Sequence, residues 1–155
     1  MGLTPLTIDS NGYKVANPRF LTCARANLRH TQKALSRRQK GSFSRAKARL
    51  KLAKANERRT NAHTDFHHKL TRQLIDDNQA VVLETLSSKN MLKNRKLAKH
   101  IADASWYSFI QKLEYKAKAD GKHLVKINQW FASLKTCHAC NHKTEALALS
   151  VRQRD

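Results

Sequence analysis

One acidic residue stands at the end of a short apolar segment and directly ahead of a strongly basic one. Glu84 follows Val81-Val82-Leu83. The basic segment that comes next contains Lys93, Arg95 and Lys96. A carboxylate delivered by a buried strand can bind a divalent metal ion, and nearby cations attract a phosphodiester backbone. This is how metal-dependent nucleases meet their substrate, and it makes Glu84 the candidate catalytic residue.

A single carboxylate is not sufficient for that chemistry. A two-metal site needs several carboxylates around a pair of Mg²⁺ ions roughly 4 Å apart. Asp9 lies beside the Asn11-Gly12 turn and is better explained by turn chemistry. The other acids considered fall on expected helices or at their ends: Asp76, Asp77, Asp103 and Glu114. None of them is an evident partner for Glu84.

Cys137 and Cys140 have the spacing of a zinc knuckle. Two thiolates and the tight turn between them provide half of a tetrahedral zinc site. His138 and His142 are the nearby candidates for the remaining ligands, while Cys23 is remote in sequence. A redox pair is the less favoured alternative, because the motif does not lie between a strand and an amphipathic helix.

A basic helical hairpin is expected over residues 18–78. Between positions 25 and 72 there are 15 Lys and Arg residues but only two acids, so few of the cations can be paired along a helix. Such a surface suits a phosphate backbone, whereas the alternative is an ordinary solvated helix face. The candidate nucleic-acid-binding residues here are Arg25, Arg29, Lys33, Arg37, Arg38, Lys47 and Lys51.

The elements that would position these residues follow an α/β order. Residues 3–16 are expected to form a β-hairpin around Asn11-Gly12. Helices are expected from Asn17-Pro18 to about 39 and from a Ser42 cap to about 77. A buried strand at 80–86, a polar connector at 87–100, a helix at 101–119 and a strand at 123–128 complete the prediction. His67 and His68 are assigned to the hairpin surface.

The composition narrows the class of protein. The 155 residues include 31 Lys and Arg but 11 Asp and Glu, which gives a formal net charge of +20. Nucleic acid is the default partner for such a surface, and no apolar run reaches the roughly 20 residues that cross a bilayer. Three cysteines do not form a disulfide framework. We therefore expect a cytoplasmic protein, associated with the nucleoid if it binds DNA, with neither a membrane nor a small molecule as its partner.

Several motifs, in one order along the chain, resemble the OrfB/TnpB-type transposases of insertion sequences. These are RNA-guided nucleases thought ancestral to type V CRISPR effectors. The shorter matches are Gly2-Leu3 with Ser10-Asn11-Gly12, Asn17-Pro18-Arg19-Phe20, Leu35-Ser36-Arg37-Arg38 and residues 47–53. The more specific ones are Phe66-His67-His68-Lys69-Leu70, residues 91–98, Trp106 with Leu113-Glu114-Tyr115-Lys116-Ala117, and Thr136-Cys137 with Cys140.

The resemblance implies a RuvC-like domain of the RNase H fold, with three acids that bind Mg²⁺ and a zinc ribbon inserted late. Glu84 matches the second acid, although Thr85 replaces the acidic or amide residue common after it. The first acid would stand just ahead of Met1, and the third acid and second cysteine pair would follow residue 152. Cys137 and Cys140 match the first ribbon pair. We therefore expect an internal part of such a protein, truncated at both ends.

The expected organisation is a partial RuvC-like domain over residues 1–135 and a truncated zinc-ribbon segment over 136–155. With one acid of three, the chain is expected to bind DNA and guide-type RNA without cutting, and Zn²⁺ binding would be incomplete. One rival is an active Mg²⁺-dependent nuclease completed by Asp9 or another chain. The others are a basic regulatory module that binds RNA or DNA, and a chain that does not fold stably because its sheet edges are unpaired.

Overall fold

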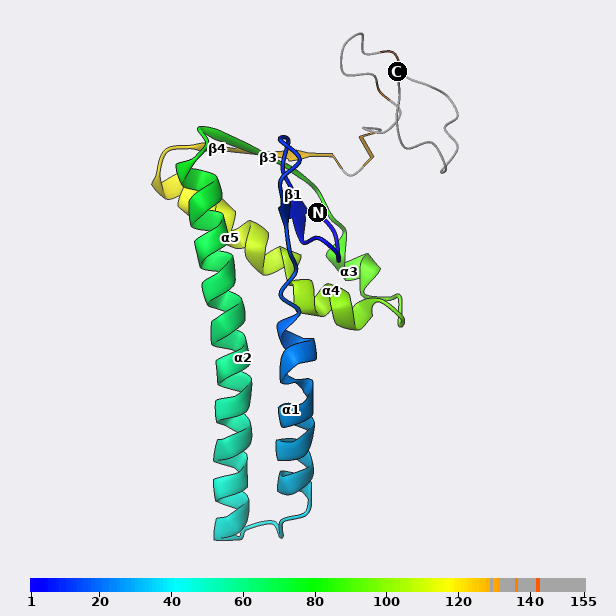
Figure 1. Cartoon of the computed structure of the whole chain (residues 1–155), viewed down its shortest axis with the longest axis vertical. Helices are drawn as coiled ribbons and strands as arrows, with labels where there is room; N and C mark the ends of the chain where they lie inside the picture. Colours follow the sequence, from blue (N-terminus) through cyan, green and yellow to red (C-terminus); the bar gives the residue numbers. More distant parts are fainter. Residues whose placement is uncertain (129, 132–135, 137–141, 143–155) are drawn as a thin grey trace.

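The computed structural model describes residues 1–128, 130–131, 136 and 142. This part of the chain is a mixed α/β structure, as the sequence predicts (Figure 1). The strands are β1 (Thr7–Ile8), β2 (Lys14–Val15), β3 (Ala80–Glu84) and β4 (His123–Ile127). The helices are α1 (Phe20–Ser36), α2 (Phe43–Asp76), α3 (Ser88–Met91), α4 (Ala98–Ala104) and α5 (Trp106–Ala119). No helix in the described part is both long and apolar enough to cross a membrane.

The first sheet is the expected hairpin. Strands β1 and β2 pair antiparallel, with Thr7 opposite Val15. The turn between them contains Gly12 at a φ of 81° and is held by Asp9, whose Oδ1 accepts hydrogen bonds from the N–H groups of Asn11 (3.0 Å) and Tyr13 (2.7 Å). The prediction that Asp9 serves the turn is confirmed.

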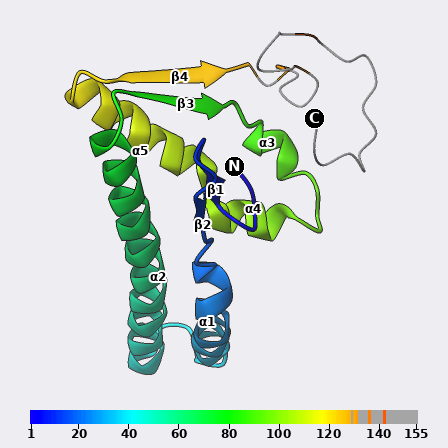
Figure 2. The ribbon, with the colours of Figure 1, turned by 45° about the horizontal axis from the view of Figure 1, so that its top comes forward.

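The second sheet is parallel, and it brings the carboxyl ends of two distant strands to one edge. β3 pairs with β4 so that Glu84 lies opposite Ile127, and helices α3, α4 and α5 form the connection between the strands. The strand predicted from position 80 is confirmed, but the prediction that it is buried and extends to 86 is wrong: β3 ends at Glu84, and Val82 keeps 57 % of its surface exposed. Helix α5 packs below the sheet (Figure 2), and Val82 alternates with inward-facing Val81 and Leu83.

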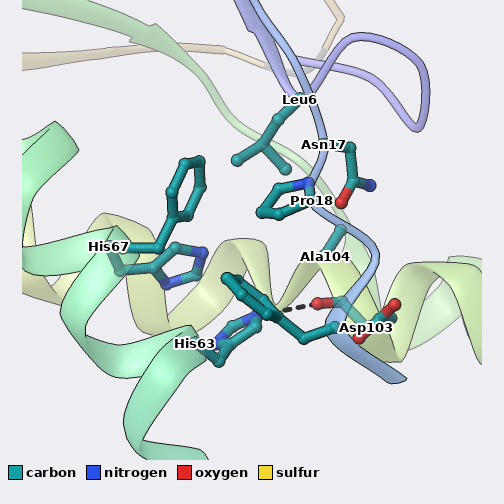
Figure 3. A pocket seen from close by; sticks show the side chains of 9 residues that line it. Leu6, Asn17, Pro18, His63, His67, Asp103 and Ala104 are labelled. Carbon is teal, nitrogen blue, oxygen red and sulfur yellow. Dashed lines mark hydrogen bonds between the residues drawn. The ribbon is translucent and has the colours of Figure 1, made fainter. Parts of the chain in front are cut away.

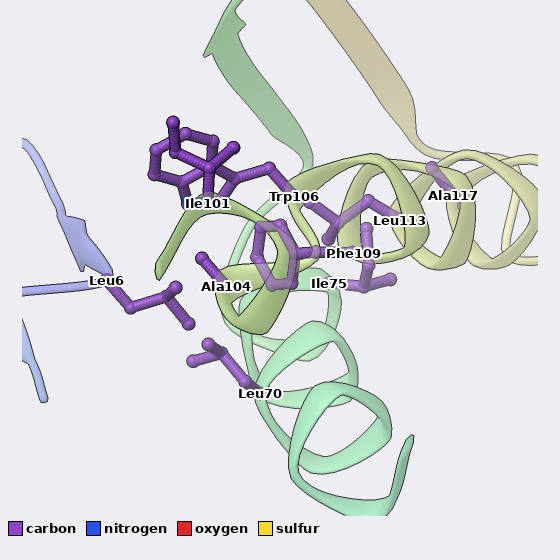
Figure 4. Close-up of a cluster of buried hydrophobic side chains, with 9 residues drawn as sticks. All are labelled: Leu6, Leu70, Ile75, Ile101, Ala104, Trp106, Phe109, Leu113 and Ala117. Carbon is purple, nitrogen blue, oxygen red and sulfur yellow. The ribbon is translucent and has the colours of Figure 1, made fainter. Parts of the chain in front are cut away.

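The core lies where α2 and α5 cross beneath this sheet (Figure 4). Its fully enclosed members include Ile75 from α2 and Phe109 and Leu113 from α5, each at most 1 % exposed. Leu6, from just before β1, closes the cluster on the side of the small hairpin. The core therefore draws on residues from Leu6 to Ala117, and it fixes both the sheet and the base of α2.

Helices α1 and α2 form the long hairpin that the basic sequence predicts, lying side by side and extending away from the sheets (Figure 1). With 17 and 34 residues they reach about 26 and 51 Å. The Ser42 cap is confirmed, because its Oγ accepts a hydrogen bond from the N–H of Arg45 at 3.2 Å. Helix α1 packs on α2, and its least exposed apolar residues are buried Leu28 and half-buried Leu21, Ala24 and Leu35.

Two helix boundaries differ from the prediction. Helix α1 begins at Phe20, because Asn17 Oδ1 binds the N–H of Arg19 in a turn and Arg19 takes a left-handed conformation with φ 50°. The helix expected at 101–119 is two helices that join at Ser105, whose φ is 45°. The connector at 87–100 accordingly contains α3 and the start of α4.

Candidate nucleic-acid interface and the Glu84 edge

The predicted cations of the hairpin are all exposed, but they belong to two different surfaces. Arg25, Arg29 and Lys33 lie along the outside of α1, and Arg37 continues the row at the helix end. Arg38 instead lines a groove between the two helices together with Lys47 and Lys51 of α2. Only the second set is brought together by the fold.

The groove has a volume of about 350 Å³ and is lined by residues of both helices: His30, Thr31, Ala34, Arg38, Ser44, Lys47, Ala48 and Lys51. Two alanines leave the groove open, because longer side chains there would fill it. The Ser44 hydroxyl can act as a hydrogen-bond donor beside three cations, whereas the Thr31 hydroxyl already donates to the Asn27 carbonyl at 2.9 Å. None of these lining residues is acidic. This arrangement can accept phosphate groups from a nucleic-acid backbone.

Arg45 closes the tip of the hairpin, a role the sequence analysis missed. Its Nη1 donates to the carbonyl oxygens of Leu35 (3.2 Å) and Arg38 (2.8 Å), two acceptors near the carboxyl end of α1. A guanidinium at this place satisfies free carbonyls and opposes the negative end of the helix dipole. The sequence signal that could have revealed this role is a cation placed just after the break between the two helices.

Glu84 stands at the carboxyl end of β3, and half of its side-chain surface is exposed. Its Oε1 forms an ion pair with the amino group of Met1. The backbone N–H of Thr85 donates to the carbonyl of Ile127 at 3.1 Å, which continues the strand pairing past the acid. The strand thus holds the carboxylate at the sheet edge, where it remains accessible to solvent.

Three of the other acids, Asp76, Asp103 and Glu114, have partners of their own. Asp76 pairs with Arg72 at 2.7 Å, and Arg72 also reaches Asp120 at 2.8 Å. These contacts raise the pKa of Arg72, chiefly through the hydrogen bond with Asp76. Within the described residues no three His, Cys, Asp or Glu side chains converge as a metal-binding group. This donor set does not fit a two-metal Mg²⁺ site.

The basic connector is exposed, and it follows the Glu84 edge. Lys93, Arg95 and Lys96 lie between α3 and α4, where Asn94 Oδ1 accepts a hydrogen bond from the N–H of Lys96 at 3.1 Å. Cys137 and Cys140, the predicted zinc ligands, lie outside the described residues. Cys23 is exposed on α1, far along the chain from that pair.

The assignment of His67 to the hairpin surface is wrong, because its side chain is only 1 % exposed. Its ring lies 4.2 Å from the ring of His63 between centroids (Figure 3). It also packs in a T-shaped arrangement with Phe109 of α5, at 5.5 Å between centroids. Burial, followed by the charges of His63 and Lys112, lowers the pKa of His67 to about 4. His67 is therefore a neutral core residue at the base of the hairpin.

Two of the family-like motifs meet in space and join α2 to α5. Lys116 Nζ donates to the carbonyl oxygen of His68 (2.7 Å) and to Thr71 Oγ1 (2.9 Å), while the Tyr115 hydroxyl lies 3.3 Å from His68 Nδ1. Burial and then repulsion by Arg72 lower the pKa of Lys116. These residues hold the hairpin on the core.

Fold and site together define a mixed α/β chain with a strongly basic helical hairpin and an acid at a parallel-sheet edge. Residues 1–95 match the OrfB family of the IS605 type, described as "Probable transposase", and residues 106–154 match the "Cas12f1-like, TNB domain" family. The chain belongs to this OrfB/TnpB transposase family.

Curated relatives extend the comparison. A "Putative RNA-guided DNA endonuclease" of Streptomyces pristinaespiralis is 43 % identical over 152 residues, which cover 98 % of this chain and 38 % of the relative. A protein of the same description from Mycobacterium tuberculosis is 33 % identical over 83 % of this chain and 29 % of its own length. A "TnpB-like protein" of Acanthamoeba polyphaga mimivirus is 27 % identical over 57 % and 18 %. The chain thus spans well under half the length of these relatives.

Proposed function

We propose that this chain is the nucleic-acid-binding part of a TnpB-type RNA-guided DNA endonuclease, with DNA and guide-type RNA as its partners. The observation that carries the proposal is the groove between α1 and α2, where Arg38, Lys47 and Lys51 converge without an acid among the lining residues. The names of the relatives supply the substrate class. In this proposal the described α/β unit is part of a RuvC-like domain, and Cys137 with Cys140 provides half of a zinc ribbon.

The electrostatics favour a long polyanion over a small anion. Besides the groove, a second row of cations, Lys33, Arg29 and Arg25, lies along the outside of α1, a helix about 26 Å long. A phosphate backbone can neutralise many of these charges at once and release its counterions, which makes binding strongly dependent on salt. A small anion would occupy the groove alone and leave that row uncompensated.

We further propose that the chain alone binds nucleic acid without cleaving it. Glu84 matches the second acid of the expected trio, and the described residues offer no group of three or more His, Cys, Asp or Glu side chains that could hold a metal ion. Without them a divalent ion is held weakly and an attacking water is not oriented.

A second candidate is an active nuclease in which carboxylates from elsewhere join Glu84. The favouring observation is that the Glu84 carboxylate is half exposed and lies against the amino group of Met1. A residue attached ahead of Met1 would therefore lie beside the Glu84 carboxylate. The family pattern has an aspartate at that position. In this candidate Glu84 is already correctly placed, and only additional ligands are needed.

Binding is tested by measuring the affinity of the 155-residue chain for duplex DNA and for RNA at several salt concentrations. The doubly substituted Lys47→Ala/Lys51→Ala variant is expected to lower the slope of log affinity against log salt by about 2. The matched control is Lys99→Ala/Lys118→Ala, which removes the same charge from exposed positions on α4 and α5. Equal effects of both pairs would contradict a groove-centred interface.

Cleavage is tested separately with supercoiled plasmid and Mg²⁺ or Mn²⁺. We expect no nicking by the 155-residue chain. Nicking that disappears in Glu84→Gln would establish the second candidate instead. A chain extended by one aspartate ahead of Met1 should bind Mn²⁺ more tightly than the same extension with asparagine, because two carboxylates then face one ion.

A further inference from the structure

We propose that the edge at the carboxyl ends of β3 and β4 binds single-stranded nucleic acid by stacking bases on Trp130 and Phe131. The proposal rests on the proposed nucleic-acid binding and assigns it a second contact surface, distinct from the hairpin groove. The starting observation is exposure: Trp130 keeps 82 % of its surface accessible and Phe131 keeps 56 %. Large aromatic side chains at such exposure carry a free face on which a base can stack.

The local backbone holds these two residues close to the sheet edge. The N–H of Trp130 donates to Asn128 Oδ1 at 2.9 Å, and the N–H of Phe131 donates to the Asn128 carbonyl at 3.0 Å. Asn128 directly follows Ile127, the last residue of β4. The side chain and the carbonyl of one asparagine thus form a turn that starts where the strand stops.

The parallel register places this turn at the same edge as Glu84. Ile127 is the pairing partner of Glu84, and three residues of chain span at most about 10 Å, so Trp130 stays within that distance of Ile127. An antiparallel partner would have put the two strand ends at opposite edges. The crossover through α3, α4 and α5 is therefore what brings an acid and an aromatic pair together.

Charge at this edge fits a polyanion. Strand β3 leads into α3 (Figure 2). Helix α3 carries exposed Lys89, and exposed Lys93 follows two residues after its end. A single strand with bases stacked on Trp130 and Phe131 would offer its phosphates to these lysines. Duplex DNA cannot use the aromatic pair in this way, because its bases are already stacked on one another. Single-stranded nucleic acid is therefore the fitting partner.

The two tryptophans of the chain provide a direct test, because Trp106 is 2 % exposed whereas Trp130 is 82 % exposed. Titration of the 155-residue chain with an oligo(dT) single strand is expected to quench the long-wavelength emission of Trp130. The buried Trp106 should be unaffected. Trp130→Phe should remove the quenchable signal and keep most of the affinity, since phenylalanine still stacks.

Affinity provides the second readout. Trp130→Ala is expected to weaken oligo(dT) binding about 5- to 100-fold and to change duplex binding less than twofold. The matched control is Tyr107→Ala, which removes a ring 68 % exposed on α5. Two results together would overturn this inference: the emission of the unsubstituted chain is not quenched by oligo(dT), and Trp130→Ala binds oligo(dT) with unchanged affinity. If Lys47→Ala/Lys51→Ala still weakens duplex binding in that case, the proposed function stands; a chain that binds no nucleic acid contradicts both.

Discussion

The Asp103 carboxylate accepts a hydrogen bond from the backbone N–H of Leu21 at 2.9 Å, across a separation of 82 residues. Leu21 lies in the first turn of α1, whose own cap position, Arg19, makes no side-chain capping bond. The carbonyl oxygen of Asp103 also accepts a hydrogen bond from Nε2 of His63, a residue of α2, at 2.7 Å (Figure 3). One residue of α4 therefore ties both helices of the basic hairpin to the core.

Loss of the Asp103 carboxylate should weaken that attachment. We expect Asp103→Ala to lower the free energy of unfolding by about 1–2 kcal/mol, because a free N–H at the start of α1 loses its acceptor. Urea denaturation monitored by circular dichroism measures the change. Asp65→Ala is the control: its carboxylate makes an exposed pair with Lys69, so the loss should stay below about 0.5 kcal/mol. Similar losses in both variants would show that Asp103 has no special role.

Lys116 should matter for stability in spite of its charge. Lys116→Met keeps the stem but removes the donors to the His68 carbonyl and to Thr71, and we expect a loss of about 1–3 kcal/mol in unfolding free energy. Lys118→Met, at an exposed position two residues away, should change it by less than about 0.5 kcal/mol. A more stable Lys116→Met chain would mean that the cost of burying the ammonium outweighs its hydrogen bonds.

His67 should make the fold sensitive to acid. Its pKa is about 4 in the folded chain and about 6.5 in the unfolded chain, so between these values the unfolded chain binds more protons. The contribution of His67 is therefore fully present above about pH 6.5. As pH falls from about 6.5 to about 4, on the order of 3 kcal/mol of stability should be lost. Urea midpoints measured at a series of pH values test this.

Two variants isolate that dependence. His67→Leu should flatten the stability profile between pH 4 and 6.5, because no ionisable group remains at that buried position. His100→Asn should leave the profile as it is, since His100 is exposed on α4. A profile unaltered by His67→Leu would assign the acid sensitivity to other groups.

Filling the groove should weaken nucleic-acid binding without any change of charge. Ala48→Leu places a bulky side chain between Lys47 and Lys51, and we expect about a tenfold loss in duplex affinity at fixed salt. Ala53→Leu makes the same substitution at an exposed position on α2 that does not line the groove. Fluorescence anisotropy with labelled duplex compares the two. Equal affinities would indicate that the phosphates bind the outer row of α1 instead.

Local signals in the sequence were enough to predict most elements. Asn11-Gly12 indicated the hairpin, and Ser42 indicated the start of α2. The apolar residues Leu124, Val125 and Ile127 indicated β4. These features depend on turn geometry, capping and short-range periodicity, which act over a few residues. The excess of cations and the strand-end position of Glu84 could be recognised in the same way.

Only the tertiary structure decided which of these residues meet. His67 looked like a surface residue because its neighbours are polar, but the packing of α4 and α5 against α2 buries it. Helix packing places Arg38 in the groove, apart from the row of cations on the outside of α1 that begins at Arg25. The parallel pairing of β3 with β4 brings the end of β4 next to Glu84. Contacts of this kind join residues tens of positions apart, so helix crossing and strand register set them, and no local pattern encodes either.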